Sequence, residues 1–189
     1  MNAVLEAIQN RRSVRSFRPQ PVPADLLRTV IAAANQAPSG MNTQPWRFVV
    51  VEDKALKRRL VETAVPNSRK YLEPLKEVNP GRYASIMKRY DELEDPVYYS
   101  APAIIFVIGA GAYASDSCPL ACENLMLAAL SFGLGSCWVK LGSLITDNPE
   151  IVSALELKEG ESIFGPILIG YPTEQPKAPP KRDPVIKWI

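Results

Sequence analysis

The sequence predicts a single α+β domain, and three observations lead to this fold class. Two early segments and one later segment carry the apolar spacing of helices. Short apolar segments of strand length lie between and after them. The chain has 189 residues, 47% of them hydrophobic, which is enough for one substantial core. The order helix, helix, strand, charged segment, strand, helix, strand, strand is typical of a layered α+β fold.

The N-terminal part is predicted to supply two helices and one strand. Residues 2–10 carry apolar side chains at helical spacing and lead directly into a cluster of arginines. Residues 24–36 repeat the helical pattern, and Pro38 and Gly40 end it. Residues 46–52 are then expected to form a buried strand.

A charged, tyrosine-rich segment follows at residues 54–99. Prolines divide it into short pieces, which leave room for one or two helices. We therefore expect a charged helical excursion at about residues 66–100, within one domain that spans residues 1–189.

The C-terminal half is predicted to complete the sheet. Residues 103–108 are apolar and β-branched, as in a buried strand, and residues 119–132 form a nearly all-apolar helix. Two further strands are expected near residues 136–141 and 163–170. From about residue 172 the chain is rich in proline, so we expect an extended tail that runs across another surface.

The overall composition excludes several classes of protein. A net charge of +2 gives no general reason to expect nucleic-acid or membrane binding. The apolar runs are shorter than the roughly 20 residues that span a bilayer, and the N-terminus lacks a signal-peptide pattern. Three cysteines without paired spacing favour neither a disulfide framework nor a zinc site. We expect a cytoplasmic protein.

The chain contains no histidine. Histidine is the commonest general base, the usual partner of a nucleophilic serine or cysteine, and the commonest metal ligand. Its absence argues against hydrolases and metalloenzymes. An enzyme of this composition would depend on an organic cofactor, while the protein supplied binding, orientation and electrostatics.

The first candidate site is the basic cluster that follows the first predicted helix. Arg11, Arg12, Ser13 and Arg15 place three guanidinium groups and one hydroxyl within five residues. Guanidinium groups match phosphate oxygens with paired donors, so the cluster predicts a phosphate site. The alternative is that these arginines stay solvated and interact only with the dipole of the preceding helix.

The second candidate site is the loop at residues 38–46, between a helix and a strand. It concentrates hydroxyl and amide groups, and Gly40 permits the close approach of a planar ligand. The alternative is an ordinary loop that is rich in turn-forming residues.

Together, these two segments resemble the FMN-dependent nitroreductases. Members of that family begin with an RRSxRxF-like segment and continue with APSxxNxQPWxF; here the segments are RRSVRSF and APSGMNTQPWRF. The resemblance continues through LAALSFGLGSCWV, FGPILIGYP and PPKRDP, and it covers almost the whole chain except the excursion.

The resemblance implies a fold, a cofactor and a set of cofactor-binding residues. The fold would be a central, mainly antiparallel sheet flanked by helices, in a homodimer with a swapped C-terminal tail. FMN would be bound by residues from four parts of the chain: Arg11, Arg12, Ser13 and Arg15; Ser39, Gly40, Asn42 and Gln44 toward the flavin of the neighbouring subunit; Trp138, Val139 and Lys140 beside the ring; and Lys181 and Arg182 at the phosphate.

The resemblance also implies an activity. Family members use NAD(P)H to reduce FMN at N5 and then reduce an electron-poor acceptor such as a nitroaromatic compound or a quinone, so no side chain need be catalytic. Met41 and Tyr71 would contact the substrate. Two other interpretations stay open beside this one: a flavin storage or sensor protein without turnover, and a structural protein without a cofactor.

The position of the excursion resembles the lid of a branch that dehalogenates halotyrosines. Tyr71 falls near that branch's lid tyrosine, but Asn67 stands where the branch has a carboxylate. We therefore treat dehalogenation as a minor alternative.

Overall fold

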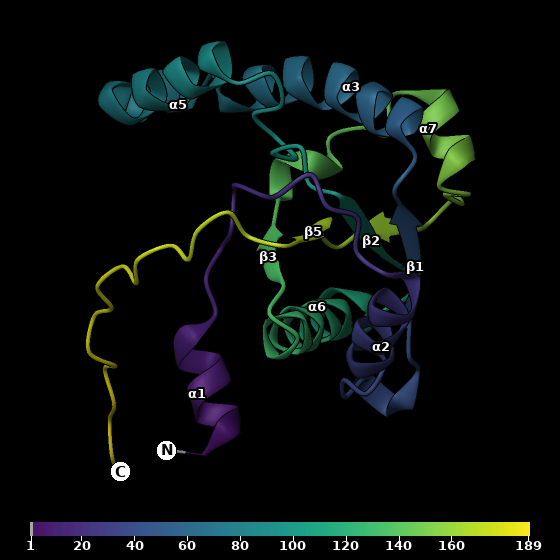
Figure 1. The fold of residues 1–189 in the computed structure, drawn as a ribbon, viewed down its shortest axis with the longest axis vertical. Helices are drawn as coiled ribbons and strands as arrows, with labels where there is room; N and C mark the ends of the chain where they lie inside the picture. The colour runs from purple at the N-terminus through teal and green to yellow at the C-terminus, as the bar shows by residue number, and fades with distance from the viewer. Residues whose placement is uncertain (1) are drawn as a thin grey trace.

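An antiparallel sheet forms the middle layer of the computed structural model, which describes residues 2–189 (Figure 1). Four strands lie in the order β1 (Trp46–Val51), β2 (Ala103–Gly109), β5 (Ile167–Gly170) and β3 (Gly135–Trp138). A short strand, β4 (Ser162–Ile163), also pairs with β2. All these pairs are antiparallel, so the expected α+β class and antiparallel sheet are confirmed.

Strand β2 occupies the centre of the sheet because its side chains are apolar on both faces. All seven of its residues are buried. Successive side chains of a strand point to opposite faces, and here Ile105 and Val107 enter one core while Ile104 and Phe106 enter the other. The sheet therefore separates two hydrophobic cores.

Helices α2 (Ala24–Ala34) and α6 (Ala114–Ser131) cover one face of the sheet (Figure 1). Helix α6 begins five residues before the predicted start at residue 119, and Pro119 lies inside it. A proline removes one hydrogen bond of the helix, but the buried side chains of α6 continue on both sides of Pro119 and hold the helix together. The sequence reasoning was wrong to take the proline as the start.

Helices α3 (Lys54–Leu72), α4 (Leu75–Val78), α5 (Pro80–Glu92) and α7 (Pro149–Ala154) lie on the opposite side of the sheet (Figure 1). The charged segment was expected to break into short pieces, but α3 alone has 19 residues and passes through Pro66. Its residues Leu60, Ala64 and Ser68 are buried at a spacing of four, so packing on one face outweighs the proline. Helix α7 was not predicted.

The last two predicted strands are shorter than expected. The strand predicted near residues 136–141 ends at Trp138, and the 3-10 helix η2 (Lys140–Ser143) follows it. The one predicted near 163–170 divides into β4 and β5, because Gly165 between them has a φ of 126° that glycine adopts readily.

The two ends of the chain lie outside the layered body. Helix α1 (Ala3–Asn10) contains no buried residue, and the tail after Pro172 has no helix or strand (Figure 1). That the tail is extended and runs across another surface stays a prediction.

Candidate functional site

The basic segment after α1 runs along the outer side of β3. The amide of Val14 donates a hydrogen bond of 2.9 Å to the carbonyl of Ser136, and a parallel bridge joins Ser13 to Ser136. The Val14 side chain is buried against Gly135, where an added Cβ would lie 2.8 Å from it. Because neighbouring residues of an extended segment point to opposite sides, Ser13 and Arg15 face away from this contact.

The arginines of this segment have few partners among the residues described. The Nε of Arg11 lies 3.3 Å from a carboxylate oxygen of Glu123. Arg12 donates through Nη1 to the carbonyls of Gln9 and Arg11, each at 2.6 Å. Arg15 is exposed. Within residues 2–189 its guanidinium has no hydrogen bond or ion pair. The segment therefore keeps guanidinium donors available for an anion.

The thiol of Cys137 shows how closely the segment surrounds β3. Burial raises the pKa of Cys137, while the charges of Arg15 and Arg11 and the hydroxyl of Ser13 oppose that increase in pKa. Three of the four residues of the basic cluster thus lie near Cys137 of β3.

The end of β3 supplies the second part of the predicted site. The amide of Val139 donates to the carbonyl of Pro166 at 3.0 Å, and its side chain is buried. Trp138 is half-buried and packs on the core beside α6, while Lys140 is exposed. The structure therefore brings the basic segment and residues 138–140 together.

A pocket of about 310 Å³ lies where these two parts meet the excursion. Arg15 and Val139 belong to its lining, and the excursion adds apolar and aromatic walls; the full lining is Arg15, Leu72, Ile86, Arg89, Tyr90, Pro96, Val97, Tyr99, Val139 and Leu141. This volume is at the lower end for pockets that bind small molecules. The sequence analysis did not identify Arg89 or Tyr99. The only sequence signal for them was the tyrosine-rich, charged composition of the excursion.

The predicted loop at residues 38–46 lies elsewhere. It contains the 3-10 helix η1 (Gly40–Asn42), and the amide of Gly40 donates to the Ser117 hydroxyl at 3.3 Å, near the start of α6. Helices α1 and α2, which precede the basic segment and this loop, lie on opposite sides of α6 (Figure 1). Within one chain, this loop does not join the basic segment.

The backbone of this loop is held in an unusual conformation. Met41, Asn42 and Gln44 have φ values of 52°, 54° and 45°, which non-glycine residues seldom adopt. The amide of Gln44 donates to the Ser39 hydroxyl at 3.0 Å and supports the turn. Met41 is 84% exposed. Strained backbone with an exposed apolar side chain is typical of a binding loop.

Three further predicted site residues lie apart from the pocket. Lys181 and Arg182 are exposed on the tail, and no hydrogen bond or ion pair joins them to the rest of residues 2–189. Tyr71 lines a separate open groove beside Asn67 and Asp147. The Asn67 amide donates to both Asp147 carboxylate oxygens, at 2.9 and 3.0 Å. These hydrogen bonds join α3 to the loop after η2.

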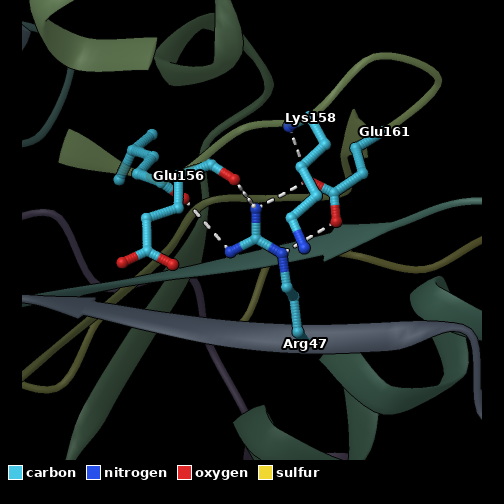
Figure 2. Close-up of polar contacts among 5 residues, drawn as sticks. Arg47, Glu156, Lys158 and Glu161 are labelled. Carbon is cyan, nitrogen blue, oxygen red and sulfur yellow. Dashed lines mark hydrogen bonds and ion pairs between the residues drawn. The ribbon is translucent and has the colours of Figure 1, made fainter. Parts of the chain in front are cut away.

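Arg47 of β1 forms a second, contrasting arginine site that sequence reasoning missed. Figure 2 shows its guanidinium between the backbone of residues 155–156 and the carboxylate of Glu161. It donates to Glu161 at 2.8 and 2.6 Å and to the carbonyls of Leu155 and Glu156 at 3.1 and 2.8 Å. The hydrogen bond from Arg47 lowers the pKa of Glu161 to about 2.

The described residues contain neither a cluster of metal ligands nor a helix suited to a membrane. Within residues 2–189, no cluster of three or more metal-ligating side chains is present. In the same range, no helix is both long enough and apolar enough to cross a membrane.

Comparison with known proteins gives one consistent set of relatives. The model of the nitroreductase family matches residues 8–171. The NADH dehydrogenase of Thermus thermophilus is 32% identical over 182 residues, which cover 89% of this chain and 86% of that protein. The iodotyrosine deiodinase of Thermotoga neapolitana is 27% identical over 192 residues, covering 100% of this chain and 98% of that protein.

A solved structure has the same fold along its whole length. The crystal structure of a nitroreductase with bound FMN from Desulfitobacterium hafniense DCB-2 has a TM-score of 0.80 and 28% identity. The match covers 100% of this chain and 99% of that one.

Proposed function

This chain belongs to the nitroreductase family, and we propose that it is an FMN-dependent oxidoreductase that uses NAD(P)H to reduce electron-poor acceptors. Nitroaromatic compounds and quinones are the proposed acceptors. One observation carries the proposal: the guanidinium of Arg15 has no partner within residues 2–189 and borders a pocket with apolar and aromatic walls. The FMN named in the Desulfitobacterium structure and the NADH named in the Thermus relative support it.

The residues present fit FMN by their chemistry. A flavin mononucleotide has an anionic phosphate and a planar, largely apolar ring, and it therefore needs cationic donors beside an apolar slot. Arg11, Arg12 and Ser13 would hold the phosphate and ribityl chain, because they are consecutive residues of the basic segment, which pairs with β3 at Ser13 and Val14. FMN supplies two-electron redox chemistry when it is bound, so the chain needs no catalytic side chain of its own.

Residues around the pocket would orient the ring and exclude water. Arg15 would donate to a polar edge of the ring, and Trp138, Val139 and Lys140 would border it with their backbone. Leu72 and Ile86 of the excursion would shield the other side of the pocket from solvent. In this arrangement catalysis depends on positioning two reactants against the ring.

We further propose that the protein is a homodimer. Helix α1 exposes Val4, Leu5 and Ile8 and buries nothing, and an isolated helix of eight residues is unstable in water. The tail exposes Val185 and Trp188 in the same way. A second copy could cover both elements and could bring Ser39, Gly40, Asn42 and Gln44 to the flavin of its neighbour.

Deleting residues 179–189 tests the proposed role of the tail. We expect the truncated protein to lose both dimerisation and bound flavin, because Lys181 and Arg182 would be removed with the apolar residues. A full-length variant with Val185, Ile186 and Trp188 all replaced by Ser is the matched control, and it should weaken the dimer while keeping the two cations. A truncated protein that stays dimeric and fully yellow by sedimentation and absorbance would refute the wrapping tail.

Dehalogenation of halotyrosines is the second candidate, since one relative is an iodotyrosine deiodinase. The groove beside Tyr71 argues against it. In that groove Asn67 stands where the lid carboxylate of the dehalogenating branch would be. The Asp147 carboxylate beside it already accepts from the Asn67 amide, so it is not free to meet a substrate ammonium group. We therefore favour nitroaromatic and quinone acceptors.

An absorbance spectrum followed by reduction tests the main proposal. The purified protein should show flavin bands, and denaturation should release FMN, because the basic segment suits a single terminal phosphate. Anaerobic NADH or NADPH should bleach the bands, and 1,4-benzoquinone should restore them. Persistent bands after NADH and NADPH would favour a storage or sensor protein, and a colourless protein that does not bind added FMN would exclude the flavin function.

The cysteines support a proposed cytoplasmic location. Cys118, Cys122 and Cys137 are buried and free of disulfides, as is usual in a reducing compartment. Burial raises the pKa of Cys118 to about 11 and that of Cys122 to about 12, so both stay protonated at neutral pH.

A further inference from the structure

The pocket beside Arg15 has an uneven charge. Two of its lining residues are arginines, Arg15 from the basic segment and Arg89 from α5, and no Asp or Glu lines it. The other walls are apolar or aromatic. A cavity of this kind favours an anionic ligand with a flat apolar body.

Within residues 2–189 Arg89 has no carboxylate partner, in contrast to the nearby cations Arg69 and Lys88. The nearby acids of α5 are already engaged: Asp91 lies 2.7 Å from Arg69, and Glu92 lies 3.7 Å from Lys88. The charge of Arg89 is therefore left uncompensated on the side of the pocket.

Two arginine–tyrosine stacks in the excursion differ in whether the arginine is paired with a carboxylate. Arg69 lies 5.4 Å from the ring centre of Tyr90 and is neutralised by Asp91. Arg89 lies 5.8 Å from the ring centre of Tyr99 and has no such neutralising acid. Stacking on a ring orients a guanidinium but leaves its N–H groups at the edge available for an anion.

The position of Tyr99 is fixed by its own loop. Tyr99 has a φ of 54°, in the left-handed region that a bulky residue seldom adopts. Asp95 holds this turn, because its carboxylate accepts hydrogen bonds from the amides of Tyr98 at 2.7 Å and Ser100 at 2.8 Å. The loop thus keeps the ring in place beneath Arg89 before any ligand arrives.

We propose that the electron acceptor of this protein is a planar aromatic anion whose carboxylate, or a similar anionic group, pairs with Arg89. The inference rests on the proposed function, which assigns Arg15 to the flavin and leaves Arg89 as the remaining cation of the pocket. The flavin ring occupies the side of the pocket formed by Arg15 and Val139. The ring of the acceptor lies against Leu72, Ile86 and Tyr99 on the other side, and its anionic group lies toward α5. Arg89 is then a specificity-determining residue.

Two acceptors that differ in charge alone test the proposal. 4-Nitrobenzoate and methyl 4-nitrobenzoate share the ring and the nitro group, but only the first is anionic. In Arg89→Gln, kcat/KM for 4-nitrobenzoate should fall about fivefold to tenfold, mainly through KM, because Arg89 is exposed and its charge is partly screened. The methyl ester should change less than twofold. Arg89→Lys should recover part of the preference for the anion.

The matched control is Arg82→Gln, an exposed arginine of the same helix that does not line the pocket. It should leave both acceptors unchanged. Calorimetric titration with 4-nitrobenzoate measures binding without turnover, and Arg89→Gln should weaken it by the same factor.

Each result bears on either the acceptor or the flavin function. Equal losses for both acceptors, or slower bleaching of the flavin by NADPH in Arg89→Gln, would overturn the acceptor assignment. A wild-type protein that binds FMN but reduces neither the nitro compounds nor 1,4-benzoquinone would instead overturn the proposed function, while the calorimetric comparison would still decide whether Arg89 binds the anion.

Discussion

Arg47 and Arg15 are both arginines of extended segments, yet their guanidinium groups differ in how many hydrogen bonds they make within the protein. Arg47 donates four hydrogen bonds, two to a carboxylate and two to backbone carbonyls (Figure 2). Arg15 has none within residues 2–189 and faces a pocket. A guanidinium with four of its five N–H donors engaged by the protein supports structure, whereas one that is left unpaired beside a cavity is available for a ligand.

The surroundings explain the difference. Glu161 accepts from Arg47 and also from the amide of Lys158 at 2.9 Å, and its side chain is only 13% exposed. The pair joins β1 to the segment between α7 and β4, far along the chain. At Arg15 the neighbouring groups are apolar or cationic. The comparison predicts large stability effects at the first site and ligand effects at the second.

The largest effect is expected at Arg47. Arg47→Ala leaves the largely buried Glu161 carboxylate without its counter-ion and two carbonyls without donors, so the free energy of unfolding should fall by about 3 kcal/mol. Urea unfolding measures this loss, and Arg47→Lys should restore only part of it. A loss below about 1 kcal/mol would mean that the contact is no stronger than an ordinary surface ion pair.

The pH dependence of stability should follow Glu161. Its pKa is lowered to about 2 in the folded protein, so its contribution is present above its unfolded value of about 4.5 and is lost as pH falls toward 2. The loss over this range should be roughly 2 kcal/mol.

Urea midpoints at pH 7, 4 and 2.5 measure that slope. Glu161→Gln should be less stable at pH 7 and should show a flatter dependence over this range. If the variant kept the wild-type slope, other carboxylates would account for acid sensitivity.

A smaller effect, on ligand binding, is expected at Arg15. Arg15→Ala should weaken FMN binding to the apoprotein about tenfold, because one charge-assisted contact is lost from an exposed side chain. The free energy of unfolding of the apoprotein should change by less than about 0.5 kcal/mol. Arg58→Ala, at an exposed arginine that lines a different pocket, is the control and should bind FMN normally. If Arg15→Ala destabilised the apoprotein and left FMN affinity unchanged, Arg15 would have a structural role like that of Arg47.

The smallest effect is the coupling between Arg11 and Arg182. If both grip one phosphate, the double alanine variant should depart from the sum of the single variants by about 0.5 kcal/mol or more in FMN binding. Titrating the wild type and three variants with FMN completes the cycle. Strict additivity would show that the two arginines act on different parts of the cofactor or that one of them does not contact it.

Much of the body could be predicted from local patterns. The strands at β1 and β2 and the helices α1 and α2 match their predicted positions closely, because each follows a simple apolar period or an apolar run. The charged excursion could not be predicted in this way. Helix α3 passes through Pro66 because Leu60 and Ala64 pack in the core, and a single sequence does not show that packing.

The candidate site divides along the same line. The sequence by itself determined which residue types are present: a basic cluster, a polar loop, apolar strands and no histidine, since these are properties of neighbouring residues. Only the tertiary structure decided that the guanidinium of Arg47 is bonded within the protein and that of Arg15 is available, because the partners of Arg47 lie 108 to 114 residues away in the sequence. Arg89 likewise joins Arg15 at one pocket only after α5 meets the basic segment and the residues that follow β3. Availability of a charge depends on distant groups that compete for it, and folding alone brings those groups together.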